Sequence, residues 1–131
     1  MLAIAAAALW IVAPPRAGSA KQPNVMFTSP VVLAAPVLAN CSILNVDDVA
    51  HEITIDVIRA TNGDRVISSF TRTLDPGIGV TIGFSPISGV TTAYYCKFTL
   101  SSEPEHYRAN LQIQSATSNT AVLVNPAILI N

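Results

Sequence analysis

Two short segments of this sequence concentrate side chains that could bind a cation. The first carries two aspartates, a histidine and a glutamate, and the second carries two glutamates and a histidine. The seven residues are Asp47, Asp48, His51, Glu52, Glu103, Glu105 and His106. Carboxylate oxygens suit Ca²⁺, whereas two imidazoles with one carboxylate suit Zn²⁺. Ordinary solvated turns are also rich in Asp and Glu, so whether the two segments form one site depends on the fold.

Motifs of catalysis and cofactor binding are missing from the sequence. It holds no nucleophile elbow, phosphate-binding loop, zinc-finger spacing or glycine-rich dinucleotide turn. The serines occur in expected strands and turns, with no sequence signature of an activating base. We therefore expect a protein that is not an enzyme and that has no cofactor.

The first 20 residues have the pattern of a cleaved secretory signal. An apolar, alanine-rich run at 2–13 is followed by prolines, Arg16 and small residues, with cleavage expected after Ala20. This run is shorter than the roughly 20 residues of a membrane span. No basic residue precedes Leu2, so the true translation start stays open. The remaining residues, 21–131, are expected to form one exported domain.

The mature chain is weakly acidic. Without Arg16 its formal net charge is −2. This charge argues against nucleic acid and against an anionic membrane surface as partners.

Cys41 and Cys96 are the only two cysteines, 55 positions apart. In an exported protein a lone pair of cysteines is more often a disulfide than a metal or redox site. A lipid-modified Cys41 is the alternative, because Leu-Ala-Asn-Cys at 38–41 loosely resembles a lipidation box. The asparagine before the cysteine argues against it.

Alternation of apolar and polar residues predicts an all-β domain without a helical stretch. Strands are expected at about 25–38, 37–46, 52–57, 65–74, 78–84, 92–100, 106–115 and 120–130. Asn62-Gly63 and Asp75-Pro76-Gly77 predict tight turns. Because proline cannot donate to a sheet ladder, Pro30 and Pro36 indicate that the first stretch is an interrupted edge strand, able to pass from one sheet to the other.

The sequence Tyr94-Tyr95-Cys96, taken with Cys41 and about seven to eight strands, resembles the immunoglobulin-like superfamily over residues 25–124. It is also similar to small exported bacterial domains of that class without a settled function, which share segments like NCSILNV, TLDPG and YYCKF. The resemblance implies a sandwich of two antiparallel sheets joined by an inter-sheet disulfide, with Tyr94 as a corner residue whose hydroxyl bonds to the backbone. The tryptophan that antibody-type domains place after the first cysteine is absent, so Ile53, Ile55 or Val57 must fill that space.

The resemblance also implies a location for the cation-binding candidates. In such a sandwich the turns after the two cysteine strands emerge at the same end. The seven acidic and histidine residues would then form one rim, able to bind a divalent cation or a cationic group of a partner.

A second candidate surface follows the strand at 106–115. Its outward residues would be Arg108, Asn110, Gln112 and Gln114. Such a strip can bind sugars, although a solvent-facing strand has the same pattern. Tyr95 also faces outward and could stack on a ligand.

These observations lead us to expect an exported, non-catalytic binding module for an unknown protein or carbohydrate. The alternative is a structural subunit of an extracellular or cell-surface assembly. In that case one of the two apolar terminal stretches, 25–38 or 121–130, would add a strand to a neighbour's sheet.

Overall fold

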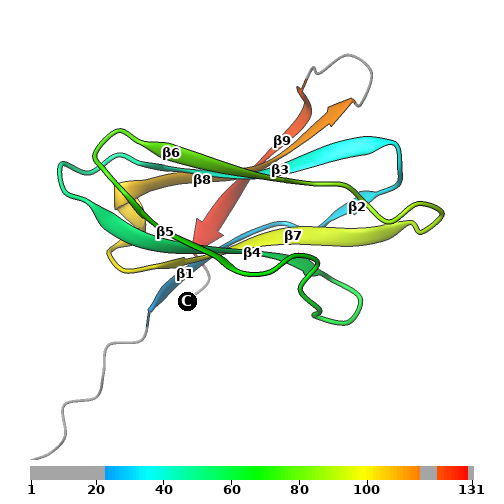
Figure 1. Ribbon diagram of the computed structural model, residues 1–131, viewed down its shortest axis with the longest axis horizontal. Coiled ribbons are helices and arrows are strands. Elements are labelled where there is room, and N and C mark those ends of the chain that lie inside the picture. The colour runs from blue at the N-terminus through cyan, green and yellow to red at the C-terminus, as the bar shows by residue number, and fades with distance from the viewer. Residues whose placement is uncertain (1–22, 116–120, 130–131) are drawn as a thin grey trace, which may run out of the picture.

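The computed structural model describes residues 23–115 and 121–129. The predicted signal segment lies outside these residues. The described part is all-β, as the alternation predicts, with nine strands and one short 3₁₀ helix (Figure 1). The elements are β1 (Asn24–Thr28), β2 (Val31–Leu33), β3 (Val37–Asn45), β4 (His51–Arg59), β5 (Phe70–Leu74), β6 (Gly79–Phe84), β7 (Thr92–Leu100), η1 (Pro104–His106), β8 (Tyr107–Ser115) and β9 (Ala121–Leu129). No helix among the described residues has the length and apolar character needed to cross a membrane.

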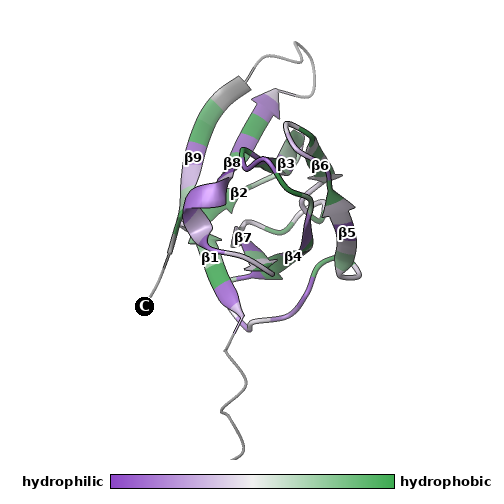
Figure 2. Cartoon of the chain, turned by 90° about the vertical axis from the view of Figure 1, so that its left-hand side faces the viewer, coloured by the Kyte–Doolittle hydropathy of each residue, from purple (hydrophilic) through white to green (hydrophobic). Residues whose placement is uncertain are grey.

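The predicted sandwich of two separate sheets is wrong. The strands form one antiparallel sheet in the order β5-β4-β7-β1-β9-β8-β3-β6, and β2 pairs with β7 beside this path. The sheet curls into a nearly closed barrel, seen along its strands in Figure 2, and its open seam lies between β5 and β6, the two ends of this strand order. The immunoglobulin-like two-layer architecture therefore does not describe this chain.

Strand β9 joins the parts that a sandwich would keep separate. It pairs with β1 from Met26↔Leu129 to Thr28↔Ala127, and with β8 along its other side. In Figure 1 it crosses from β8 to β1. The first stretch is interrupted after Thr28, as Pro30 predicts, and continues as β2, which pairs with β7 alone among the described strands. The edge position predicted for it is wrong for β1, which lies between β7 and β9.

Pro126 is tolerated inside β9 although the strand is internal to the sheet. β1 has already ended at Thr28, whose partner is Ala127. Pro126 is paired with Asn110 of β8, and no residue of β1 lies opposite it. On the side of β1, the N–H that proline lacks would therefore remove no backbone hydrogen bond of the sheet.

The barrel is filled by the inward residues of its strands. The largest fully buried side chains include Tyr94, Phe98, Tyr107, Ile55 and Leu111. The predicted disulfide is confirmed: Cys41 on β3 and Cys96 on β7 are bridged, with Cα atoms 5.8 Å apart. Because these strands lie on opposite sides of the barrel, the bridge crosses its core and does not join two sheets.

Tyr94 does not form the predicted corner. Its side chain is completely buried, against Phe84, with ring centroids 5.6 Å apart. Its hydroxyl makes no hydrogen bond within the described residues. The tyrosine therefore acts as a core aromatic and not as a tie to the backbone.

The strand predicted at 65–74 is shorter in the structure. Only β5 pairs with β4, and Arg65 forms an isolated bridge to Ile58. The segment between them folds over the outer face of β4, where Ser69 donates to Asp56. As a result Asp56 and Ile58, which alternate outward, are both buried.

Candidate metal centre

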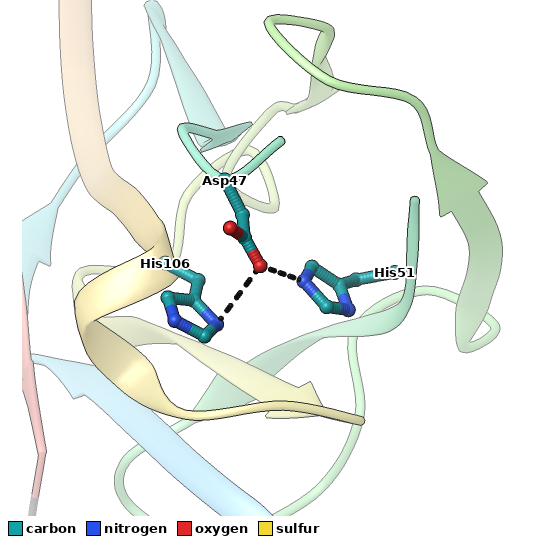
Figure 3. A group of neighbouring side chains, drawn as sticks. All are labelled: Asp47, His51 and His106. Atoms are coloured by element: carbon teal, nitrogen blue, oxygen red, sulfur yellow. Dashed lines mark hydrogen bonds and ion pairs between the residues drawn. The ribbon is translucent and has the colours of Figure 1, made fainter. Parts of the chain in front are cut away.

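Three of the seven predicted rim residues converge at one end of the barrel (Figure 3). Asp47 lies in the turn after β3, His51 is the first residue of β4, and His106 is the last residue of η1. Asp47 Oδ2 is 2.6 Å from His51 Nε2 and 3.2 Å from His106 Nδ1. One potential ligand atom from each side chain lies within 4.8 Å of the others. We call these three residues the Asp-His-His cluster.

The two turns meet because β3 and β7 end at the same end of the barrel. The Val46 N–H donates to the His106 carbonyl at 2.8 Å, which ties the first turn to η1. The disulfide links β3 and β7, the two strands that precede these turns, across the core. The shared-end expectation thus holds in this barrel, and it does not require two sheets.

The other four rim residues do not join the cluster. Asp48 is exposed, and its backbone N–H donates to Asp47 Oδ1 at 2.8 Å. Glu52 is exposed on β4, opposite Thr73 of β5. The Glu103 carboxylate lies 3.4 Å from Asn24 Nδ2, and Glu105 is exposed in η1. The acidic rim is therefore a compact three-residue centre with separate carboxylates around it.

Asn45 positions Asp47 from inside the barrel. It is fully buried at the end of β3, and its amide nitrogen donates to the carbonyls of Val49 and Leu74, at 2.8 and 2.9 Å. Its amide oxygen accepts the Asp47 N–H at 3.0 Å. Asn45 is not among the predicted site residues, although the sequence carries a signal for it: it is a polar residue at an inward position, in phase with Cys41 and Ile43.

Asp47 is held as a carboxylate by its surroundings. Its pKa lies below the usual value, first because of the His51 hydrogen bond and then because of the backbone N–H of Asp48. The Asp48 backbone N–H donates to Asp47 Oδ1, whereas Asp47 Oδ2 faces the two imidazoles. The atom most suited to a cation is therefore the atom that both histidines face.

The two imidazoles stack over one another. Their centroids are 5.5 Å apart and their planes differ by 9°. His51 is the more buried, with 13% of its side chain exposed, against 19% for Asp47 and 34% for His106. The cluster is thus reachable from solvent mainly on the His106 side.

Ser102, His106 and Asp47 do not have the arrangement of a catalytic triad. Ser102 Oγ is 3.3 Å from His106 Nδ1, and the same ring nitrogen faces Asp47. A triad needs the serine and the carboxylate on different nitrogens of the imidazole. Ser102 Oγ instead donates to the Tyr107 hydroxyl at 3.0 Å.

The second candidate surface, on β8, is present but partly engaged. Arg108 is exposed, and its Nη1 donates to the carbonyls of Glu105 and Tyr107, at 3.1 and 2.8 Å. Asn110 and Gln112 line a shallow recess with Ser42 and Thr81. No aromatic residue lines this recess, so it lacks a platform for a sugar ring.

Comparison with known proteins gives evidence on fold only. No family model and no curated protein matches the sequence. The chain is similar to the crystal structure of Thermotoga maritima 1070, with a TM-score of 0.56 and 9% sequence identity. The similarity covers 83% of this chain and 96% of that chain. At this identity the likeness concerns the fold, and the resemblance to small exported bacterial domains stays a prediction.

Proposed function

We propose that this chain is an exported, non-catalytic binding module that holds one divalent transition-metal ion of the Zn²⁺ class. The ligands would be Asp47, His51 and His106. The observation that carries the proposal is the convergence of two imidazole nitrogens on one carboxylate oxygen, from three positions that are separate in the sequence.

The set of donor atoms favours zinc over calcium. Ca²⁺ takes six to eight oxygen ligands, whereas this cluster offers two nitrogens and one carboxylate. Zn²⁺ binds such a set in four-coordinate sites. Three protein ligands leave one position, which water or a donor group of a binding partner could take from the solvent-accessible His106 side.

Export is part of the proposal. The disulfide indicates a non-reducing compartment, where structural bridges persist. The secretory pattern of the first 20 residues supports the same location. The cluster is also complete without metal, since each imidazole can donate to Asp47, and this is the alternative that an experiment must exclude.

No specific observation supports the other candidate function, a structural subunit that adds a terminal strand to a neighbour's sheet. β1 and β9 pair with each other, and each has a second partner in the same sheet. Strand exchange would first require β9 to leave β8. A concentration-dependent oligomer in size-exclusion chromatography would favour assembly over a stand-alone module.

Metal binding can be tested by thermal unfolding of the tag-free, oxidised protein with Zn²⁺, Ca²⁺ or Mg²⁺. A ligand that binds only the folded state at 100 times its Kd adds about 2.7 kcal/mol of stability. We expect zinc to raise the Tm and calorimetry to give one ion per chain, with little effect of calcium or magnesium.

The variants His51→Gln and His106→Gln should lose the zinc-dependent rise. The matched control is Glu105→Gln, which removes an exposed carboxylate from the same end of the barrel. This variant should keep the zinc-dependent rise in Tm. No shift at millimolar zinc, or an equal shift in the histidine variants, would overturn the proposal.

A further inference from the structure

A recess of about 470 Å³ lies on the outer face of the barrel, across β1, β7 and β4. Register places Phe27 beside Lys97 and Lys97 beside Asp56, so these three residues form one row across the strands. Tyr95 lies two positions before Lys97, on the same face of β7. The β4–β5 segment adds Asp64 and Arg65 as a wall.

Two aromatic rings form part of the lining of this recess. The ring centroids of Phe27 and Tyr95 are 6.0 Å apart, with planes inclined by 53°. Both side chains are half-buried, so each keeps part of its ring surface accessible. Solvent-facing strand positions commonly carry small polar residues, and two adjacent rings here provide an apolar platform.

A buried carboxylate stands beside the rings. Asp56 is only 2% exposed, although it alternates outward on β4. Ser69 Oγ donates to its Oδ1 at 2.5 Å, and Arg65 Nε pairs with the same oxygen at 3.1 Å. Burial of a charge is costly unless it is paired and hydrogen-bonded, so this wall is an ordered part of the structure.

The polar groups of the recess balance one another. Asp56 and Asp64 carry two negative charges, and Arg65 and Lys97 carry two positive ones. Arg65 contacts Asp56 through Nε, which leaves its terminal nitrogens as further donors. Lys97 makes no ion pair with another described residue. A ligand with no net charge, and with both donors and acceptors, fits this lining.

We infer that this recess binds a neutral pyranose unit of an oligosaccharide. Sugar hydroxyls both donate and accept, which matches the Lys97 and Arg65 nitrogens and the exposed Asp64 carboxylate, whose Oδ2 also accepts from Asn62 Nδ2. The C–H face of a pyranose is apolar and packs on an aromatic ring, as other apolar groups do. The inference is independent of the metal centre, which lies on other residues.

Calorimetric titration with neutral oligosaccharides built from glucose, xylose, mannose or N-acetylglucosamine units tests the inference. We expect at least one to bind at millimolar concentration, with affinity unchanged by a chelator. Tyr95→Ala should weaken binding by about tenfold, since one stacking contact contributes on that scale. Lys97→Met, which keeps the apolar stem, should also weaken it.

The matched control is Gln112→Ala, on the β8 face that offers amides without an aromatic ring; it should bind as the unaltered protein does. Circular dichroism checks that each variant is folded, and Tyr95→Leu replaces Tyr95→Ala if the latter is not. Absence of binding to all four sugar classes would overturn the inference. So would binding only to acidic sugars, binding that survives both Tyr95 and Lys97 substitutions, or loss of binding in Gln112→Ala.

Discussion

Two buried polar side chains of the barrel differ in how far their hydrogen-bonding groups are satisfied. Asn45 uses both amide hydrogens and its oxygen, and connects the end of β3, the following turn and the end of β5. The Tyr94 hydroxyl is buried and has no partner among the described residues. A satisfied buried amide stabilises its surroundings, whereas a buried unpaired hydroxyl costs free energy.

Replacement of Tyr94 by phenylalanine should therefore leave stability unchanged or raise it by about 1 kcal/mol, because it removes an unpaired buried group. Urea unfolding monitored by circular dichroism measures this. Tyr107→Phe is the matched control: its hydroxyl accepts from Ser102, so that variant should lose about 1 kcal/mol. A marked loss in Tyr94→Phe would indicate a corner-type hydrogen bond after all.

Asp47 makes stability depend on acid pH. Its pKa is lowered in the folded protein, chiefly by the His51 hydrogen bond, whereas in the unfolded chain it is near 3.9. A lowered folded-state pKa contributes stability that is present above about pH 4 and is lost as pH falls through the folded value.

The variant Asp47→Asn should thus show a smaller loss of stability below about pH 4 than the unaltered protein. Chemical unfolding at a series of pH values in metal-free buffer gives the comparison, with Glu105→Gln as control. If the free energy of unfolding falls equally below pH 4 in Asp47→Asn and in the unaltered protein, the hydrogen bonds to the Asp47 carboxylate do not stabilise the fold.

At the scale of elements, the centre depends on where β3 and β7 end. Each strand is followed by a turn that carries part of the Asp-His-His cluster or leads into it, and the bridge keeps both strands on one core. Removal of the bridge should therefore affect the metal centre as well as the fold.

The double variant Cys41→Ala, Cys96→Ala should lose about 4 kcal/mol of unfolding free energy, the value expected for a closed loop of this length. Its zinc-dependent rise in Tm should also shrink, because the two turns would be held together by the Val46–His106 hydrogen bond without the covalent link between their strands. Unfolding and zinc titration on the same samples measure both. If the variant is less stable but keeps the full zinc-dependent rise in Tm, the metal centre does not depend on the bridge.

Alternation predicted the elements well where strands are long and half-buried. The strands around Cys41, Cys96 and Leu111 lie within a few residues of their expected bounds, because period-two burial is a local property. The β4–β5 segment was predicted poorly. Ser69 and Arg65 bind Asp56 across the sheet face, and a long-range contact of this kind leaves no trace in periodicity.

At the scale of the whole molecule, the sequence could not reveal the neighbours of each strand. Alternation tells which side chains face the core, and it is the same in a sandwich and in a barrel. The pairing of β9 with both β1 and β8 decides between them, and its β1 side joins residues about 100 positions apart. The candidate centre was nevertheless located in part, since the shared strand ends survive the change of architecture.

The seam between β5 and β6 has a consequence for self-association in concentrated solution. Each of these two strands ends the strand order with one open backbone edge, each is short, and the turn at Asp75-Pro76-Gly77 connects them directly. A strand from another molecule would have to pair between β5 and β6, where the connecting turn blocks one end of the gap. It would also meet the charged side chain of Arg72 on β5. Short, charged edges of this kind disfavour amyloid-like stacking, so the barrel should tolerate high protein concentration without forming fibrils.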